Sequence, residues 1–435
     1  MKGDVEIMNN KKSVLVIPHL FYPELASTAQ IYTELFHELE NDFDITVLCA
    51  VPCYSGHIDD KYKVKGKDLY EEQYGNIKIL RVPVKEFDKT DKKSRVKHIL
   101  SYYNNCKKQI AKLGHFDVTF VCSQPPIIGG MLGVYSKKKN HSKLIYNIQD
   151  FNPEQAEAVM SKKLKPAFDL MKKIDMKSCE KADEVIVVGR DMAETLKNRF
   201  KDKNVPKYTV INNWIDEKQI YPLPPDNLKV LEFKKKYGLE DKFVFMYSGN
   251  IGLYYDLLNI LKTINQIPKD IKTHDEKEVV FAFVGAGSVL EDMKKYKEEN
   301  HMDNVVFIPY QPKDELIYSL NAADVHLCVN AKGIKGVSVP SKCYGIMAVG
   351  KPILGILEKG SECEQIISNS NCGLISEPKE YSKFIDNILL FINKCDNLEI
   401  GCNGYLYLLN GYGKKLSVEK YRNIIFEVDK KNEKL

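Results

Sequence analysis

Short apolar runs that alternate with helical stretches recur along almost the whole chain, and this alternation constrains the fold more than any other feature. The runs are four to six residues long and mostly apolar, which is typical of strands buried on both faces of a parallel sheet. We expect strands at 13–17, 44–49, 77–82, 118–122, 144–148, 184–188 and 208–211, and then at 243–247, 279–284, 305–308, 325–329 and 352–356. Strand, helix and strand at this spacing predict right-handed parallel units.

The series is interrupted once, by the proline-containing run Tyr221-Pro222-Leu223-Pro224-Pro225, which is typical of an interdomain linker. A chain of 435 residues is also too long for one typical domain. The sequence therefore predicts an α/β fold with two Rossmann-like, doubly wound parallel-sheet domains, residues 1–220 and 221–415, facing a central cleft. In such sheets ligands bind at the carboxyl ends of the strands.

The net charge is only +5, so composition provides no general argument for nucleic-acid binding. The basic residues are unevenly placed, because residues 85–145 carry thirteen Lys and Arg against four Asp and Glu. Within this stretch, 94–113 has apolar residues near one helical face and lysines among the other positions. The basic region 89–143 could therefore lie on an anionic membrane surface, or it could be an ordinary domain helix with a solvated lysine face.

The eleven cysteines are odd in number and scattered, and no pair has Cys-x-x-Cys spacing. This usage indicates reduced thiols in a cytosol and argues against a disulfide scaffold or a zinc site. The first twelve residues are polar and charged, and no apolar run approaches the roughly 18–20 residues that cross a bilayer. We expect a cytoplasmic protein whose only membrane contact is peripheral.

The stretch from Lys335 to Pro352 is predicted to form a glycine-started loop, a short helix and the beginning of a strand. Free backbone N–H groups before the helix, together with the charge of Lys342, could cradle a diphosphate. The alternative is an ordinary β–α connection with a solvated lysine, since such a motif alone is weak.

Three further motifs follow predicted strands of the second domain. In 248–252, two glycines allow backbone to approach a ligand, and Asn250 could donate to it. Gly285 and Gly287 form half of a dinucleotide fingerprint, but position 290 is Leu, which argues against a nicotinamide cofactor. Tyr310, in 309–312, could frame a planar base. Tight turns are the alternative for all three.

In the first domain, Asp150 and Glu154 follow a strand, where two carboxylates could perform acid–base work or hold a sugar hydroxyl. A helix N-terminal cap is the alternative for this pair. His19 follows the first strand and could contact an acceptor or act in catalysis, although lone histidines are more often structural.

Several motifs recur in a familiar order. They are Tyr22-Pro23-Glu24, Ser123-Gln124-Pro125-Pro126, 149–154, Asn213-Trp214-Ile215-Asp216, 247–252, Ala323-Asp324-Val325, Val339-Pro340-Ser341-Lys342 and 347–352. Together they resemble the family 4 retaining glycosyltransferases of the GT-B fold, over about residues 13 to 425. Within that family the chain is most similar to the colanic acid or fucosamine transferase branch.

The resemblance implies a nucleotide-sugar donor bound mainly by the second domain and an acceptor bound mainly by the first. The implied donor residues are Gly249, Asn250, Gly285, Tyr310, Gln311, Gly336, Ser338 and Lys342. The implied catalytic residues are Asp150, Glu24 and His19, and the implied acceptor residues are Ser27, Thr28 and Glu154. No metal or other cofactor is expected, because positive charge and backbone dipoles neutralise the leaving diphosphate. The last helix, within 416–435, would cross back to the first domain.

The chain departs from the wider family at one important point. Many members carry two glutamates, separated by seven residues, before the helix that leads to Gly-Lys-Pro, and here those positions are Val337 and Gly345. Asn250 also stands where many members have arginine. We therefore expect a variant donor site, in which Glu362 replaces the missing ribose ligand.

The sequence thus predicts an enzyme that moves a sugar, of the N-acetylhexosamine type, from a UDP-sugar to a lipid-linked saccharide at the inner membrane face. Its product would belong to capsule, O-antigen or exopolysaccharide synthesis. Two alternatives stay open, a catalytically degenerate scaffold and a UDP-sugar epimerase. No nucleic-acid partner is expected.

Overall fold

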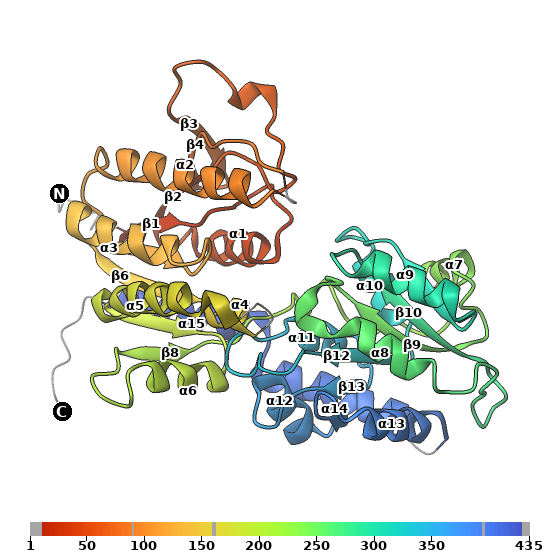
Figure 1. The fold of residues 1–435 in the computed structure, drawn as a ribbon. Coiled ribbons are helices and arrows are strands. Elements are labelled where there is room, and N and C mark those ends of the chain that lie inside the picture. The colour runs from red at the N-terminus through yellow and green to blue at the C-terminus, as the bar shows by residue number, and fades with distance from the viewer. Residues whose placement is uncertain (1–10, 89–90, 159–161, 394–395, 429–435) are drawn as a thin grey trace, which may run out of the picture.

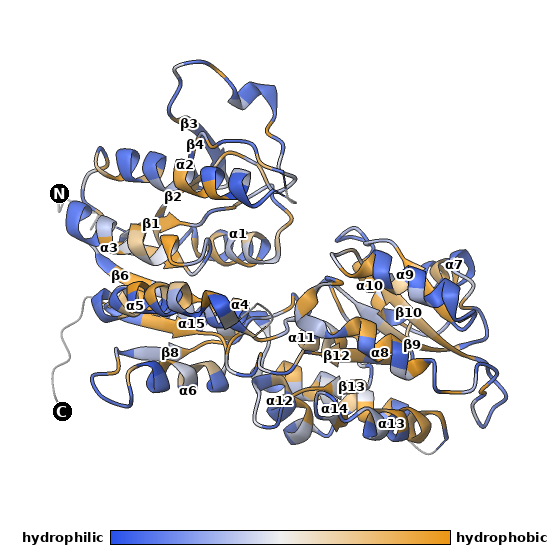
Figure 2. Cartoon of the chain, viewed as in Figure 1, coloured by the Kyte–Doolittle hydropathy of each residue, from blue (hydrophilic) through white to orange (hydrophobic). Residues whose placement is uncertain are grey.

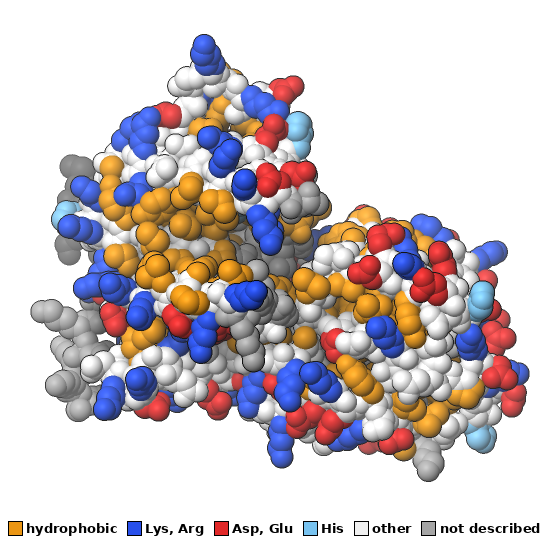
Figure 3. Space-filling view, in the orientation of Figure 1, with side chains coloured by type: hydrophobic (Ala, Val, Ile, Leu, Met, Phe, Trp, Pro, Cys, Tyr) orange, Lys and Arg blue, Asp and Glu red, His pale blue; other side chains and the backbone are white. Residues whose placement is uncertain are grey.

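The computed structural model describes residues 11–88, 91–158, 162–393 and 396–428. The described chain forms two lobes, each built around its own twisted sheet with helices on both faces (Figure 1). The space-filling view shows the surface hollowed between the two lobes (Figure 3). The prediction of two doubly wound domains facing a cleft is confirmed, while the proposed boundaries at 220 and 415 stay predictions.

The first sheet has the strand order β3-β4-β2-β1-β5-β6-β7-β8. Its strands are β1 Ser13–Ile17, β2 Asp44–Ala50, β3 Tyr70–Tyr74, β4 Ile77–Val82, β5 Val118–Cys122, β6 Lys143–Ile148, β7 Glu184–Val187 and β8 Tyr208–Val210. All pairs are parallel except β3 with β4. The strand order reverses between β1 and β5, and a doubly wound sheet opens a crevice at such a point.

The second sheet has the order β11-β10-β9-β12-β13-β14 and is wholly parallel. Its strands are β9 Phe243–Ser248, β10 Val279–Val284, β11 Val305–Ile308, β12 Val325–Val329, β13 Ile353–Ile356 and β14 Gly373–Ser376. Here the order reverses between β9 and β12. The crevice of the second domain is therefore expected beyond the ends of these two strands.

The helices of the first domain are α1 Ser27–Leu39, α2 Lys92–Ile110, α3 Ile128–Asn140, α4 Glu154–Glu157, α5 Lys165–Lys181 and α6 Arg190–Arg199. The second domain contributes α7 Leu228–Lys236, α8 Leu257–Ile264, α9 Leu290–Glu299, α10 Leu316–Asn321, α11 Lys342–Ala348, α12 Glu362–Ser370, α13 Tyr381–Asn393 and α14 Asn397–Gly411. The last helix is α15 Lys414–Glu427, and short 3-10 turns lie at Asp60–Tyr62, Lys162–Leu164 and Leu253–Tyr255.

The apolar strands lie inside both lobes, whereas polar residues cover the outer helix faces (Figure 2). Along β1, Leu15 belongs to the core on one face of the sheet and Val14 to the core on the other. In β9, Phe245 and Val244 divide in the same way. Burial on both faces explains why the strands are continuous apolar runs rather than alternating ones.

Two strands were not predicted from the sequence, β3 and β14. β3 has the sequence Tyr-Glu-Glu-Gln-Tyr and pairs only with β4, at the edge of its sheet, where Glu71 and Gln73 are exposed. β14 is likewise an edge strand and has the sequence Gly-Leu-Ile-Ser. Neither strand has the mostly apolar sequence that identified the others.

The final helix α15 packs against the first domain although it follows the second in sequence. Val418, Tyr421 and Ile425 share a buried cluster with Phe36 of α1 and with strand residues of the first sheet such as Phe120. Arg422 adds an ion pair of 2.8 Å between its Nε and Asp42 Oδ2. The chain thus ties its two lobes together at its end.

In the described part of the chain, no helix has the length and apolar character needed to cross a bilayer. Two predicted segments extend beyond the described residues. These segments are the basic region, at Lys89 and Thr90, and the C-terminal segment, at 429–435.

Candidate functional site

The strand-end loops of the second domain approach one another closely. Gly249 and Gly285 follow β9 and β10 with φ of +145° and +141°, a region that favours glycine. A Cβ built on Gly285 would lie 1.9 Å from the carbonyl oxygen of Gly249. The backbone conformation therefore favours glycine at both positions, and the close approach of the two loops requires it at 285.

Lys342, the first residue of α11, reaches the loop that holds Gly249. Its Nζ donates to Tyr247 Oη over 3.0 Å and lies 3.8 Å from the ring centroid of Tyr255. A Cβ on Gly249 would be 3.3 Å from Lys342 Cε. Burial lowers the pKa of Lys342 to about 8, because removal of water disfavours the ammonium form. A bound anion at this place would restore and hold its charge.

Asp150, at the end of β6, brings the first domain to the same place. It forms an isolated antiparallel bridge with Ser338, and the amide of Phe151 donates to the carbonyl of Val337 over 2.8 Å. Burial, followed by the negative charge of Asp150, raises the pKa of Tyr255 to about 12. Asp150 of the first domain therefore meets the loop of the second domain that leads into Lys342.

The carboxylate of Asp150 accepts hydrogen bonds from the side-chain amides of Gln124, over 3.1 Å, and Gln155, over 3.3 Å. It does not cap a helix, because α4 begins after Pro153 without a side-chain cap. Burial raises the pKa of Asp150 to about 6, and the bond from Gln124 opposes that rise. A carboxylate with a raised pKa beside a crevice is suited to contact or exchange protons with a sugar hydroxyl.

The other predicted catalytic and acceptor residues lie around the end of β1. His19 and Thr28 line a cavity of 30 Å³ together with Gln124. The Glu24 carboxylate accepts from the backbone N–H groups of the loop after β2, and Ser27 is exposed at the start of α1. Burial and the neighbouring His98 lower the pKa of His19 to about 3, so this imidazole is neutral near pH 7.

Gly336 is placed differently from the prediction. Its amide donates to Asp191 Oδ2 over 2.9 Å, and a Cβ on it would lie 2.4 Å from Thr195 Oγ1. Val337 is buried in the core of the first domain. The Gly336 end of this loop therefore docks on α6, and its amide is not free to hold a phosphate.

Glu154 was predicted to bind the acceptor, and the structure gives it a structural partner instead. Both of its oxygens accept from Arg199, which is 3% exposed, and Arg199 also pairs with Asp175 over 2.6 Å. This ion pair lowers the pKa of Glu154 against the effect of burial. The carboxylate ties α4 to α6 and is already saturated.

Glu362 was predicted to replace the ribose ligand, but its carboxylate is 1% exposed and bridges the two domains. One oxygen accepts from the backbone N–H and the Nε of Arg190, over 2.7 and 3.0 Å, and the other accepts from Asn212 over 2.9 Å. All three donors belong to the first domain. A ribose contact would require breaking this bridge.

The remaining donor residues are accessible. Asn250 is exposed, and Tyr310, beyond the end of β11, is 59% exposed. Gln311 is partly buried and donates to the carbonyl of Pro309 over 2.7 Å. An open aromatic ring at a strand end can stack on a planar base, so this role stays a prediction.

A larger hollow of 570 Å³ lies elsewhere in the second domain, beside α12 and β14. It contains none of the predicted site residues. We assign the site to the crevice instead, because the bridge between Asp150 and Ser338 joins the two domains there, beside the loop that leads into Lys342.

Sequence reasoning did not assign the two tyrosines that hold Lys342, nor the two glutamines that hold Asp150, to these roles. Tyr255 comes shortly after the glycine loop, so an aromatic pair at 254–255 was the available signal.

Among the described residues, two groups have metal-ligating atoms close together. They are His19, Cys53 and His98, and Cys328, Cys343 and Cys363.

Comparisons with known proteins agree with this architecture. Residues 230–399 match the family described as glycosyl transferases group 1. A Pseudomonas aeruginosa protein named as a probable glycosyltransferase, WbjE, is 30% identical over 284 residues, which are 64% of this chain and 67% of that protein. WcaI of Escherichia coli K12, named as a colanic acid biosynthesis glycosyl transferase, is 27% identical over 187 residues, 42% of this chain and 43% of that protein.

Among solved structures, Anabaena Alr3699/HepE in complex with UDP and glucose matches with a TM-score of 0.65 at 11% identity, over 95% of this chain and 99% of that one. The resemblance seen in the ordered motifs is thus confirmed, including its colanic acid branch. The chain belongs to the group 1 glycosyl transferases, and it is a glycosyltransferase with the GT-B fold.

Proposed function

We propose that this enzyme is a retaining glycosyltransferase that moves a sugar from a UDP-sugar to a lipid-linked saccharide. The transferred sugar is of the N-acetylhexosamine type, and the product belongs to a capsule, O-antigen or exopolysaccharide. Support for the polysaccharide comes from WcaI, which is named for colanic acid biosynthesis. Support for UDP comes from HepE, whose structure holds that nucleotide.

The single observation that carries the proposal is the bridge between Asp150 and Ser338, which brings Asp150 to the loop that leads into Lys342. A lysine ammonium attracts the leaving diphosphate, and it lies beside the glycine loop where backbone can approach the phosphates. Asp150 meets this loop from the acceptor domain. In this proposal the ammonium and the backbone dipoles neutralise the diphosphate, and transfer needs no metal there.

The membrane part of the proposal depends on α2. Lys93 and Lys97 are exposed on this helix, and Val96 and Leu100 between and beyond them are 55% and 50% exposed. Lysine and apolar side chains are interspersed on this side of the first lobe (Figure 3). Such a surface suits the anionic headgroups and the acyl boundary of the leaflet that holds a lipid-linked acceptor.

The direct test is to incubate the purified enzyme with a panel of UDP-sugars and a lipid diphosphate acceptor, and to identify products by mass spectrometry. A product heavier by one N-acetylhexosamine, with the donor's anomeric configuration by NMR, is the expected result. Transfer only from GDP- or ADP-sugars would contradict the choice of UDP.

Two further measurements decide between the proposal and its two rivals, a thermal-shift scan with nucleotides and a donor-consumption assay without acceptor. The observation that favours a degenerate scaffold is that positions 337 and 345 are Val and Gly, where many members of the family have glutamate. A scaffold would show no thermal shift with UDP, GDP or ADP. An epimerase would consume a UDP-sugar without any acceptor, whereas the proposed enzyme consumes it at an appreciable rate only when the acceptor is present.

A further inference from the structure

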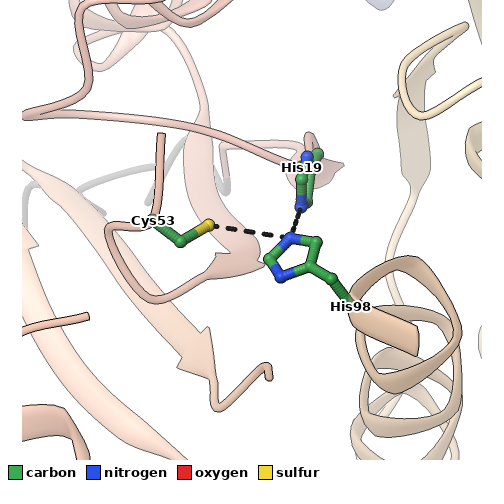
Figure 4. A group of neighbouring side chains, drawn as sticks. All are labelled: His19, Cys53 and His98. Atoms are coloured by element: carbon green, nitrogen blue, oxygen red, sulfur yellow. Dashed lines mark hydrogen bonds between the residues drawn. The ribbon is translucent and has the colours of Figure 1, made fainter. Parts of the chain in front are cut away.

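Three side chains with metal-ligating atoms meet in the first domain, although they are far apart in sequence. His19 lies just beyond β1, Cys53 lies in the loop after β2, and His98 projects from α2 (Figure 4). Their ligating atoms all lie within 4.8 Å of one another. Cys53 and His98 are 1% and 2% exposed, whereas His19 is only partly buried and lines the 30 Å³ cavity.

The surroundings of His98 orient its ring as a ligand. Its Nδ1 lies 2.5 Å from the carbonyl oxygen of Lys85, so this nitrogen carries the proton and donates it. The lone pair is therefore on Nε2, which lies 3.0 Å from His19 Nε2 and 3.9 Å from Cys53 Sγ. Histidines that bind metals usually donate their other ring N–H to a carbonyl or carboxylate in this way.

Two of the three distances between ligand atoms are near those around a zinc ion. Zinc binds histidine nitrogen at about 2.05 Å and cysteine sulfur at about 2.3 Å, so tetrahedral coordination places two such nitrogens about 3.3 Å apart, and a nitrogen and a sulfur about 3.6 Å apart. The observed 3.0 and 3.9 Å each differ by about 0.3 Å from these values. The third distance, between the ligand atoms of His19 and Cys53, is at most 4.8 Å.

We propose that His19, Cys53 and His98 bind a zinc ion, whose fourth position is open to water or another small ligand. Two imidazoles and one thiolate are ligands that zinc accepts, and Cys53 loses its thiol proton to solvent when the ion binds. Because His19 is only partly buried, the ion can reach the site from solvent beside this side chain. His19 is then a ligand and not an acid–base group.

Zinc at this place would join three elements of the first domain, the end of β1, the loop after β2 and α2. The loop carrying Cys53 also receives the Glu24 carboxylate, through the backbone N–H groups of Cys53 and Tyr54. The ion would thus hold the predicted acceptor loop and the basic helix in fixed positions. It lies in the first domain and is separate from the diphosphate site.

The second group, Cys328, Cys343 and Cys363, is the rival source of any zinc found in the protein. These thiols are at most 1% exposed and lie in the second domain. The experiment must therefore separate the two groups.

The test measures zinc per chain by mass spectrometry of the metal, in full-length protein purified without a metal-affinity step. About one equivalent is expected in the wild type. After chelation, Co²⁺ is added, and its tetrahedral visible bands and sulfur-to-cobalt charge-transfer band are recorded. Cys53→Ser should lose the charge-transfer band, and His98→Asn should lower metal content at least tenfold. Circular dichroism confirms that each variant is folded.

Cys328→Ala is the matched control for the rival group, and Cys179→Ser is the control for loss of a buried cysteine in the first domain. Both should keep the metal and the band. The proposal is overturned if wild-type protein neither holds zinc nor takes up Co²⁺. It is equally overturned if the band survives in Cys53→Ser and disappears in Cys328→Ala. Metal content is read without activity, so this result does not depend on the proposed function.

Discussion

At the scale of single residues, the site depends on Lys342 and on the two tyrosines that surround its ammonium. Tyr247 Oη accepts from Lys342 and donates in turn to the carbonyl of Asn250 over 2.6 Å. The lysine therefore has a fixed position before any ligand arrives. A fixed cation loses little entropy when a phosphate binds, which increases its contribution to binding.

Replacement of Lys342 by Met should lower kcat/KM for the donor roughly ten- to a hundredfold, because a charged hydrogen bond contributes roughly 1.5–3 kcal/mol. Steady-state kinetics with the UDP-sugar provide the measurement. Lys294→Met, on the exposed surface of α9, is the matched control and should be unchanged. If Lys342→Met has the same kcat/KM as the wild type, Lys342 does not bind the diphosphate.

Binding of UDP should weaken as pH rises through about 8, the pKa of Lys342 in the free protein. Below that pH the ammonium is charged and attracts the anion, and above it the amine is neutral. Calorimetric titration should show Kd rising roughly eightfold between pH 7.5 and 9. Lys342→Met should lack this dependence, and the same slope in that variant would assign the titration to another group.

Asp150 should produce the acid limb of the pH–rate profile. Its pKa of about 6 means that the carboxylate is ionised above that pH and protonated below it. If the ionised form contacts the substrate, kcat/KM falls as pH drops through about 6. The pH–rate profile of Asp150→Asn should lack this limb. Its kcat/KM should be roughly ten- to a hundredfold lower than that of the wild type. An unchanged limb in Asp150→Asn would show that a different group titrates.

At the scale of elements, the loops and helices around the crevice are held by buried ion pairs rather than by apolar contacts alone. Arg199 of α6 holds Glu154 of α4 and Asp175 of α5. Glu362 of α12 holds the start of α6 from the other domain. Helix α6 is therefore the element through which both the first domain and the interdomain contact are fixed.

Glu154→Ala should destabilise the first domain by about 3 kcal/mol, because it removes one partner of a buried pair. Asp175 stays with Arg199, so the loss should not exceed this amount greatly. Urea unfolding measures the effect, and Glu291→Ala, whose side chain is 82% exposed, should change stability by less than about 0.5 kcal/mol. If Glu154→Ala instead raises the KM for the acceptor without lowering stability, Glu154 binds the acceptor as first predicted.

At the scale of the whole molecule, the crossing helix α15 and the loop at 336–338 join two lobes that each have their own core. The basic face of α2 lies on the first lobe, where the acceptor is expected to bind. In the proposed function, a lipid-linked acceptor would therefore bind the same lobe that carries the proposed membrane surface.

Lys93→Glu with Lys97→Glu should weaken binding to anionic vesicles more than tenfold, since each lysine near such a surface contributes about 1 kcal/mol and reversal adds repulsion. Vesicle co-sedimentation measures the binding. The activity of the double variant on a soluble acceptor should be unchanged. Lys294→Glu with Lys295→Glu on α9, in the other lobe, is the control. Equal loss in both pairs would indicate non-specific charge attraction.

Much of the architecture could be predicted because buried parallel strands are apolar along their whole length. The twelve expected strands are present, whereas the polar edge strand β3 and the glycine-started β14 escaped notice. Lys342 and Asp150 were also identified, the first from the glycine-started loop before a short helix and the second from the resemblance to a known family. Their roles stay predictions.

The sequence by itself determined two doubly wound domains and the loops at their strand ends, since local apolar patterns are sufficient for both. Only the tertiary structure decided which groups in those loops are free. Gly336, Glu154 and Glu362 are each occupied by partners 45 to 172 residues away, and no local pattern records such pairings. The same holds for His19, Cys53 and His98, which lack metal-site spacing and become neighbours only when β1, the loop after β2 and α2 pack together.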